Sequence, residues 1–407
     1  MTLAPQKPTL WRRVHVANVC ETVSVGIVIQ PSQYYVASSQ GIRAFRSANV
    51  GENRIVDRDW VYLSPEGHRA NSKSSLRAGD VLVVRSGAPG TACVVTEEYA
   101  GSNCIDIVFA RPHQDQVLPE YLAEFTNSPV GRRHVLGTQG GLALKHFNVG
   151  AYKQLELLLP DVAEQKKIVN LFAAWDTAIQ KTEQLIAAKE RHFAATSHLL
   201  LTSRRRLNGF SIKWGLQRAD KIFENTSRKG HLNEPLLSVT QERGVIPRDM
   251  LEGRVTMPSG ETCGFKLVEP GNFVISLRSF QGGLEHSNYR GLVSPAYTVL
   301  KELVEIDERF FRHYFKSADF IKRLSVAVIG IRDGKQISFQ DFCSIKLPFP
   351  AVDEQKAIAA FLDEAEGEII LLRKYTAALK TQKRGLMQKL LTGQWRLPIT
   401  HGDHPHA

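Results

Sequence analysis

The segment LPDVAEQKKIV, residues 159–169, contains the residue types of a metal-dependent nuclease. Pro160 and Asp161 are followed by Glu164 and Lys166, which is the loose pattern PD…ExK. In such a nuclease the carboxylates converge on one metal ion from neighbouring strands. The first question is therefore whether this segment is a nuclease site or has another role.

A second copy of the segment argues against the nuclease. PFPAVDEQKAIAAFL repeats the design of LLPDVAEQKKIVNLF, so that Glu354 corresponds to Glu164. The second copy has Ala351 where the first has Asp161, so the acidic residue is not part of the shared design. Pro160, with Asp161 as N-cap and Glu164 three residues later, is typical of a capping box. The pattern predicts the start of a helix.

The repeat extends far beyond this segment. At the same spacing, Leu200-Leu201-Thr202 matches Leu390-Leu391-Thr392, Arg206-Leu207 matches Arg396-Leu397, and Gly140 and Lys145 match Gly330 and Lys335. A mixed segment followed by a long helix therefore occurs twice, which predicts a pseudo-symmetric molecule with two lobes. We expect a first lobe at 1–160, a first helix at 161–207, a second lobe at 208–350, a second helix at 351–397 and a disordered tail at 398–407.

Both helical segments carry one apolar face. The apolar residues recur every three or four positions, and neither segment contains proline. About 40 residues would span about 60 Å. Two such helices most simply bury their apolar faces against each other as an antiparallel coiled coil, although each could instead pack on its own lobe. Phe193 and Met387 are expected off this seam, where they could contact a partner subunit.

Each lobe has loops suited to contacting a nucleic acid. Arg85-Ser86 and Arg278-Ser279 end two β-rich runs and precede glycines. Each pair therefore places a basic group and a hydroxyl group on a loop whose backbone a nucleic acid could approach closely. Solvated hairpin arginines are the alternative. A second pair of matching loops and a few isolated side chains complete the candidates for DNA contact: Gln139, Lys145, His146, Arg332, Lys335, Gln336, Arg43, Arg46, Lys73, Gln281, Arg228 and Lys229.

The composition is that of a globular protein with a basic surplus. The 407 residues are 43% hydrophobic and 23% charged, and the net charge of +11 favours a polyanionic partner, first of all nucleic acid. Five cysteines are scattered without a C-x-x-C pair, so we expect buried free thiols and no structural zinc. No apolar run is long enough for a membrane span, and no signal-peptide pattern opens the chain, so a cytoplasmic location is expected.

The repeated lobes and helices resemble those of a known family. Two lobes, each followed by a helix that opens with P-x-x-x-E-Q-K-x-I, resemble the specificity subunit of type I restriction-modification systems. The second helix closes with the matching L-L-T-G-x-x-R-L, whereas the first has Ser203-Arg204 in place of Gly393-Gln394. The fold class expected is α+β, with two pseudo-symmetric mixed α/β target-recognition domains joined by two long helices.

The resemblance implies a non-catalytic subunit. Each lobe would recognise one half of a bipartite site in double-stranded DNA, and the helices would set the unread spacer. Two modification subunits would supply S-adenosylmethionine-dependent methylation of a flipped adenine. Restriction subunits would supply ATP- and Mg-dependent translocation and cleavage. This chain would bind no cofactor.

Two other functions remain open. A self-sufficient nuclease or methyltransferase would need a catalytic motif, and the sequence has no phosphate loop G-x-x-x-x-G-K-[ST] and no [DN]-P-P-[YF] motif. A duplicated coiled-coil scaffold without a DNA role would leave the +11 charge and the paired Arg-Ser loops unexplained. Target sequences, spacer length and the state of the restriction activity do not follow from the sequence.

Overall fold

The computed structural model describes residues 11–137, 147–251, 262–327 and 337–397, so the predicted tail at 398–407 lies outside the described residues. The chain forms two compact units, of which unit 1 comprises residues 1–183 and 374–407 and unit 2 comprises residues 184–373. Each unit contains a lobe and about half of each of two long helices, α5 (Val162–Leu201) and α10 (Val352–Leu390). The compact units thus divide both helices, whereas the predicted domains treat each helix as a segment of its own. Both helices stop short of the predicted ends at 207 and 397.

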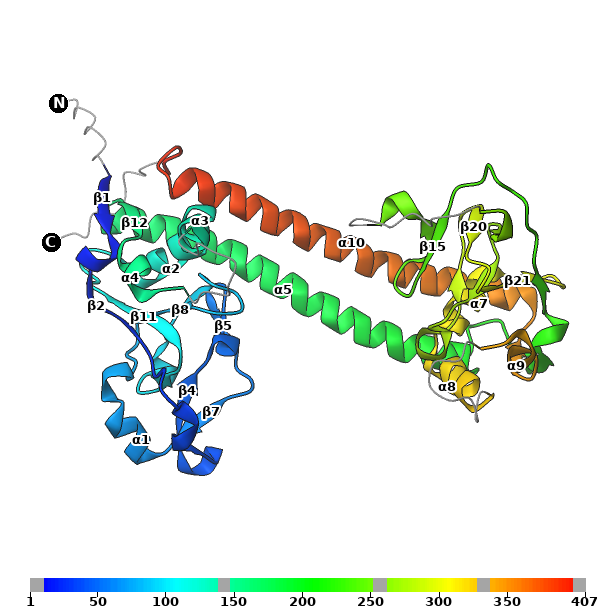
Figure 1. Cartoon of the computed structure of the whole chain (residues 1–407), viewed down its shortest axis with the longest axis horizontal. Helices are drawn as coiled ribbons and strands as arrows, with labels where there is room; N and C mark the ends of the chain where they lie inside the picture. Colours follow the sequence, from blue (N-terminus) through cyan, green and yellow to red (C-terminus); the bar gives the residue numbers. More distant parts are fainter. Residues whose placement is uncertain (1–10, 138–146, 252–261, 328–336, 398–407) are drawn as a thin grey trace. The chain divides into compact units, whose positions relative to one another are not determined.

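Lobe 1, the part of unit 1 outside the long helices, is a mixed α/β structure (Figure 1). Its strands are β1 (Arg12–His15), β2 (Cys20–Val25), β3 (Tyr35–Val36), β4 (Ile42–Phe45), β5 (Val50–Gly51), β6 (Arg54–Ile55), β7 (Val61–Leu63), β8 (Val81–Val84), β9 (Ala92–Val94), β10 (Asn103–Cys104), β11 (Ile107–Pro112) and β12 (Glu156–Leu159). Its helices are α1 (Pro65–Ala70), α2 (Pro119–Asn127), α3 (Pro129–Gly137) and α4 (Val149–Lys153).

Two four-stranded sheets organise lobe 1. The sheet β2-β11-β8-β9 lies next to α2 and the long helices, and the sheet β10-β4-β7-β3 lies with α1 at the end of the lobe farthest from those helices (Figure 1). Strand β8 is the fully buried run Val81–Val84, as expected for a central strand of Val and Leu. In lobe 1 the inner sheet therefore lies between the far sheet and the long helices.

Lobe 2, the corresponding part of unit 2, repeats the inner sheet in the order β14-β21-β18-β19. Its strands are β13 (Gly215–Arg218), β14 (Phe223–Thr226), β15 (Leu237–Thr240), β16 (Gly244–Pro247), β17 (Lys266–Val268), β18 (Phe273–Ile275), β19 (Glu285–His286), β20 (Gly291–Val293), β21 (Thr298–Glu302) and β22 (Lys346–Phe349). Its helices are α6 (Ser279–Gly282), α7 (Glu308–Phe315), α8 (Ala318–Ala327) and α9 (Phe339–Cys343).

The same turn precedes the central strand in both lobes. Gly79 and Gly271 adopt φ of 86° and 89°, a conformation that favours glycine. In the next position, Asp80 and Asn272 each accept a hydrogen bond from the backbone N–H three residues earlier. The two lobes are thus built on one frame, although the spacing between equivalent residues is slightly larger here than between the two helix starts.

The long helices pack antiparallel within each unit. In unit 1, Lys383 bonds Asp176 at 2.7 Å and Lys380 bonds Glu183 at 2.7 Å, so positions rise along α5 as they fall along α10. Two further pairs join the helices within unit 2, Lys189–Glu368 at 2.8 Å and Glu190–Arg373 at 2.5 Å. The predicted antiparallel arrangement is confirmed.

The helices also enter the cores of the lobes. Ile168 and Phe172 of α5 belong to the core of lobe 1, and Ile358 and Leu362 of α10 belong to the phenylalanine-rich core of lobe 2. The two packing modes weighed from the sequence therefore coexist.

The prediction that Met387 is free for a partner was wrong, whereas for the half-buried Phe193 a partner contact stays a prediction. Met387 is 3% exposed in the core of lobe 1, and Phe193 packs against the core of lobe 2. The reason is that helix faces turned away from the seam are covered by the lobes.

Two smaller expectations can be compared with the structure. No disulfide is present in the described residues, and Cys20, Cys93 and Cys104 are buried, but Cys263 is exposed and Cys343 half-buried. Burial of every thiol was therefore not a correct expectation. Within the described ranges, no helix combines the length and the hydropathy that crossing a membrane requires.

Candidate nucleic-acid interface

The Glu-Gln-Lys segment starts a helix, and its carboxylate is used structurally. Asp161 caps α5 by accepting a hydrogen bond from the Glu164 N–H at 2.8 Å. Glu164 does not complete a capping box, because its carboxylate accepts bonds from Arg396 (2.5 Å) and from the Trp11 indole N–H (2.9 Å). We call this arrangement the first clamp. A carboxylate engaged in this way is not placed for metal-dependent hydrolysis.

The second copy forms an equivalent cluster, the second clamp. Glu354, at the start of α10, receives Arg206 through two bonds of 2.5 and 2.6 Å and the Trp214 indole N–H at 2.9 Å. In both clamps the arginine comes from just beyond the end of the other long helix and its guanidinium lies over the tryptophan ring. The glutamates and arginines of the repeated motif thus join each helix start to the end of the antiparallel neighbour.

The glutamine of the motif joins each helix to its lobe. Gln165 accepts a bond from the Leu118 N–H at the start of α2, and Gln355 accepts one from the Asp307 N–H at the start of α7. Both side chains also donate to the carbonyl of the proline five residues earlier, at 2.9 Å. Gln165 and Gln355 are fully buried, so these bonds satisfy groups that water cannot reach. The repeated motif is therefore an assembly device of the fold.

Arg85 lies at one end of the inner sheet of lobe 1, where β2, β8 and β11 meet. Its guanidinium pairs with Asp106 and donates to the Phe147 carbonyl at 3.0 Å, which leaves 16% of the side chain exposed. Ser86, the next residue, is half-buried. Phe147 is the first described residue after 138–146, so Arg85 is joined to the end of the second candidate loop. Gln139, Lys145 and His146 themselves lie outside the described residues.

Arg278-Ser279 of lobe 2 is not the structural counterpart of Arg85-Ser86. Phe273 pairs with His286 at the same place in the inner sheet where Val81 pairs with Val94 in lobe 1. Counting along the chain from these equivalent pairs makes Leu277 the counterpart of Arg85. The recurrence of the two Arg-Ser pairs is therefore shifted by one position, and the two arginines take different environments.

The lobe 2 candidates differ in accessibility. Arg278 is exposed at the start of α6, and Gln281 is exposed within that helix. Ser279 is 1% exposed, and its hydroxyl accepts a bond from the Ser276 N–H at 2.9 Å, so it shapes the turn. Arg228 pairs with Glu269, and Lys229 is exposed. Arg332, Lys335 and Gln336 lie outside the described residues.

The remaining lobe 1 candidates lie in and around the far sheet. Arg46 follows β4 and donates to the Asp59 carbonyl at 2.5 Å, and Lys73 is exposed in a short 3₁₀ helix (Ser72–Ser74). Arg43, on β4, is 40% exposed, and its guanidinium lies over the rings of Trp60 and Tyr99. Sequence reasoning missed these two rings, because Trp60 directly precedes β7 and Tyr99 lies between β9 and β10, so they come together only when β4 pairs with β7 and β10.

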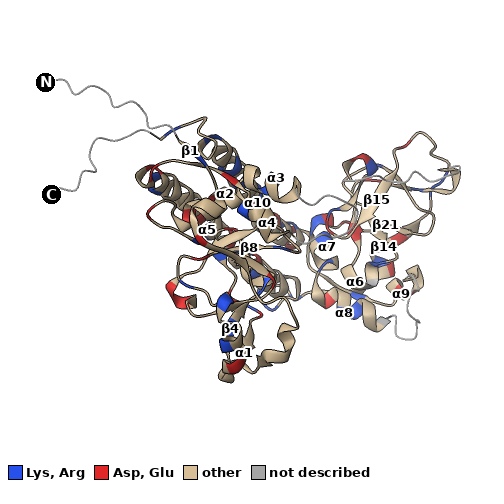
Figure 2. Ribbon diagram, turned by 60° about the vertical axis from the view of Figure 1, so that its left-hand side comes forward, with Lys and Arg blue, Asp and Glu red and all other residues tan. Residues whose placement is uncertain are grey.

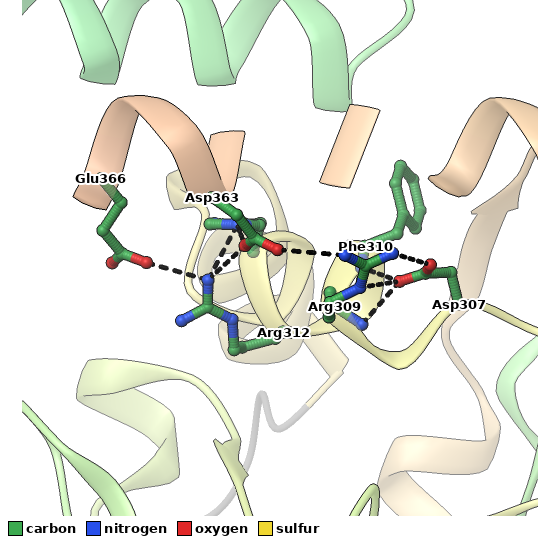
Figure 3. A network of polar contacts seen from close by, with 7 residues as sticks. Asp307, Arg309, Phe310, Arg312, Asp363 and Glu366 are labelled. Atoms are coloured by element: carbon green, nitrogen blue, oxygen red, sulfur yellow. Dashed lines mark hydrogen bonds and ion pairs between the residues drawn. The ribbon is translucent and has the colours of Figure 1, made fainter. Parts of the chain in front are cut away.

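A compact polar network in unit 2 has the residue types of a metal site. Ligand atoms of His313, Asp363 and Glu366 lie within 4.8 Å of one another. An Arg312 amino group lies 2.7 Å from Asp363, 2.8 Å from Glu366 and 3.0 Å from His313, and Arg309 bridges Asp307 and Asp363 (Figure 3). The guanidinium occupies the centre that a cation would need. We therefore assign this cluster as an ion-pair network that fastens α7 to α10.

Basic and acidic residues are interspersed along the ribbons of both units (Figure 2). The basic surplus is consequently spread over the chain, and discrimination between candidates has to come from how each side chain is held. Arg85, Arg46 and Arg228 make hydrogen bonds or ion pairs at short range, whereas the ion pair of Arg43 with Glu98 is 3.8 Å long and Arg278 is exposed.

Comparisons with known proteins agree with this architecture. No protein-family model matches the sequence. A Methanocaldococcus jannaschii protein, provisionally named type I restriction enzyme MjaX specificity subunit, is 22% identical over 96% of this chain and 95% of its own length. The type I restriction enzyme EcoBI specificity subunit of Escherichia coli is 24% identical over 44% of this chain and 39% of its own.

Solved structures show the same fold. The HsdS subunit from Thermoanaerobacter tengcongensis matches 97% of this chain and 100% of its own, with a TM-score of 0.50 and 18% identity. A chain from a study of complex assembly in a type I restriction-modification system gives a TM-score of 0.59 at 17% identity, covering 95% and 98%. The S subunit from M. genitalium gives 0.55 at 12% identity, with the same coverage.

The chain is a homologue of type I specificity subunits. The resemblance stated from the repeated motif is thereby confirmed over nearly the whole length. The predicted fold class is confirmed as well, with two sheet-containing lobes and two long packed helices.

Proposed function

We propose that this chain is the DNA-recognition subunit of a type I restriction-modification complex and has no catalytic activity of its own. The observation that carries the proposal is the duplicated lobe-and-helix organisation, matched over 96% of the chain by a specificity-subunit homologue. Lobe 1 would recognise one half of a split site in double-stranded DNA and lobe 2 the other half. The +11 net charge suits a polyanionic partner.

The partners follow from the same proposal. Two modification subunits would dock on this chain and contribute S-adenosylmethionine-dependent methylation of adenine, and restriction subunits would contribute ATP- and Mg-dependent cleavage. The complex would act in the cytoplasm, where bacterial or archaeal DNA is accessible. Glu164, the residue that suggested a nuclease, is held by Arg396 and Trp11, so nothing in this segment favours an independent nuclease.

The deciding experiment is to express the chain with its cognate modification subunit in a host that lacks adenine methylation. N6-methyladenine is then mapped across the genome. We expect one split motif, two short half-sites around a fixed gap, and no methylation when either subunit is expressed alone.

Two outcomes would contradict the proposal. Methylation by the modification subunit alone would remove the need for this chain. An assembled complex that binds DNA neither specifically nor with a salt-dependent affinity would favour the scaffold, since phosphate contacts make affinity fall steeply with salt.

A further inference from the structure

Arg43 is partly exposed, yet its guanidinium lies next to two aromatic rings. Its guanidinium carbon lies 5.4 Å from the centre of the Tyr99 ring and 5.8 Å from that of Trp60. Those two rings stack on each other at 5.5 Å with an interplanar angle of 22°, and Phe45 packs edge-on against both. The guanidinium thus lies against a pair of aromatic rings, here called the platform, while 40% of the Arg43 side chain remains exposed.

The platform is itself anchored in the core of lobe 1. Tyr99 is 6% exposed and Phe45 fully buried, and the indole N–H of Trp60 donates to Asp57 at 2.6 Å. Arg43 stands two residues before Phe45 on β4, so the two side chains share one face of the far sheet. The aromatic groups next to the guanidinium are therefore themselves part of a packed cluster.

The internal partner of the Arg43 guanidinium competes only weakly with a ligand for its N–H donors. The ion pair with Glu98 is 3.8 Å long, and 68% of the Glu98 side chain is exposed, so water screens it. Arg85 in the same lobe differs, because Asp106 and the Phe147 carbonyl use its guanidinium. Arg46 donates to the Asp59 carbonyl. Of these three candidates, Arg43 is the one whose fork of donors can bind a ligand without first breaking a short internal bond.

A planar fork of N–H donors can read a base edge in DNA. Guanine presents its O6 and N7 acceptors side by side in the major groove, and a bidentate arginine is their commonest specific partner. A phosphate contact can also use the arginine fork, but it does not distinguish one base from another. The two contacts therefore differ in their effect on base preference, which an experiment can measure.

We propose that Arg43 recognises a guanine in the half-site bound by lobe 1, with Trp60 and Tyr99 as positioning residues. This inference rests on the proposed function and goes further by naming the base and the side chain that selects it. The far sheet that carries Arg43 lies at the end of lobe 1 away from the long helices (Figure 1).

The test compares Arg43→Lys with the wild-type chain in the complete complex with its modification subunit. The methylated motif is mapped, and methylation rates are measured on duplexes that carry each base at every position of both half-sites. In Arg43→Lys, the preference for one G·C pair in a single half-site should fall roughly ten- to hundred-fold. The other half-site and the spacer should be unchanged.

Two further variants separate recognition from structure. Trp60→Leu keeps the arginine but removes part of its platform, so it should lower the preference for the same base pair by a smaller factor. Arg69→Lys is the matched control, because Arg69 is a 69% exposed arginine on α1 whose partner is Glu66. It should leave the motif intact.

The outcomes that overturn the inference are distinct. Equal preference for the G·C pair in Arg43→Lys and wild type would make Arg43 a phosphate contact. Loss of preference at all positions together, with a lowered melting temperature, would make Arg43 a structural residue. A wild-type motif with no G·C pair in either half-site would exclude the inference while leaving the proposed function intact. Absence of a split motif in the wild type would contradict the proposed function itself.

Discussion

The two clamps are nearly identical, whereas the contacts that fasten each lobe to the long helices differ. In the clamps, Glu164 and Glu354 occupy equivalent helix starts and bind an arginine and a tryptophan of equivalent origin. These residues had to be kept together in both copies, because a buried carboxylate without its cation would be costly. The residues that both copies share are therefore those that join the start of one long helix to the end of the other.

The lobe-to-helix contacts show the opposite behaviour. In unit 1, Lys383 of α10 lies buried between Glu124 of α2 and Asp176 of α5, at 3.2 and 2.7 Å. In unit 2, Arg312 and His313 of α7 bind two carboxylates of α10, and these groups are about one-third exposed except for His313 (Figure 3). Equivalent helices are thus fastened by one buried cation in one unit and by an open network in the other.

The difference indicates which parts of the duplicated chain can change independently. A clamp involves both long helices, so a change in one copy affects the neighbouring helix. A lobe-to-helix contact involves one lobe and its own helix segment, so each copy can adopt a different solution. The candidate DNA-contacting loops have the same freedom, as the shift by one position between the two Arg-Ser pairs illustrates.

The largest effect is expected when a clamp loses its carboxylate. The Glu354 side chain is 2% exposed and Glu164 is 11% exposed, so Glu354→Gln should destabilise its unit by about 3 kcal/mol and Glu164→Gln by about 2 kcal/mol. Denaturant unfolding, followed by hydrogen exchange at the starts of α10 and α5, measures each effect in its own unit.

Glu156→Gln is the control for the clamps. The Glu156 side chain is 51% exposed and its partner Arg13 is 75% exposed, so its loss should cost a few tenths of a kcal/mol at most. If the clamp variants behaved like this surface pair, the clamps would not be what joins the helices, and their shared sequence would need another reason.

The second effect concerns the buried contact of unit 1. Burial raises the pKa of Glu124 to about 7 from an ordinary 4.5, with Lys383 opposing the shift and Asp176 adding to it. A carboxyl whose folded pKa is raised contributes stability that is fully present below pH 4.5 and is lost as the pH rises through 7. From pH 5 to pH 8, the free energy of unfolding of Glu124→Gln should therefore rise by about 2 kcal/mol relative to that of the wild type. Urea unfolding at both pH values measures this difference.

The exposed Glu120 of the same helix provides the matched variant. The free energy of unfolding of Glu120→Gln should change with pH in the same way as that of the wild type. If the free energies of unfolding of Glu124→Gln and wild type changed in parallel with pH, Glu124 would ionise normally. The contact in unit 1 would then be as exposed to solvent as the network in unit 2.

Part of this molecule could be predicted from sequence because repetition exposes what is shared. The constant spacing between the two copies located both helix starts, and apolar periodicity without proline predicted both long helices and their antiparallel packing. The structural use of Glu164 was not predictable in the same way. Its partners Arg396 and Trp11 are remote in sequence, although a glutamate and an arginine present in both copies were a signal of pairing.

The candidate site was harder to predict because exposure depends on the fold. Arg85 and Arg278 have the same two-letter context, yet one is bound by Asp106 and the other is exposed. The importance of Arg43 depends on Trp60 and Tyr99, which are brought to it by strand pairing. A two-residue motif does not indicate which side chains will surround it in the fold. A motif that is repeated along a whole helix does.

The smallest expected effect tests the one departure between the helix ends. Ser203 adopts φ of 56° where Gly393 adopts 69°, and each residue ends its helix with a hydrogen bond to the third residue before it. A serine in this left-handed conformation is strained, so Ser203→Gly should stabilise unit 2 by about 0.5–1 kcal/mol. The reciprocal Gly393→Ser should destabilise unit 1 by more than that, because an added Cβ would also meet Leu158 at 3.2 Å. Denaturation midpoints of the two variants and of the double exchange measure both signs. If Ser203→Gly were neutral or destabilising, the serine hydroxyl would compensate for the strain, and the two helix ends would be equivalent in geometry but not in energy.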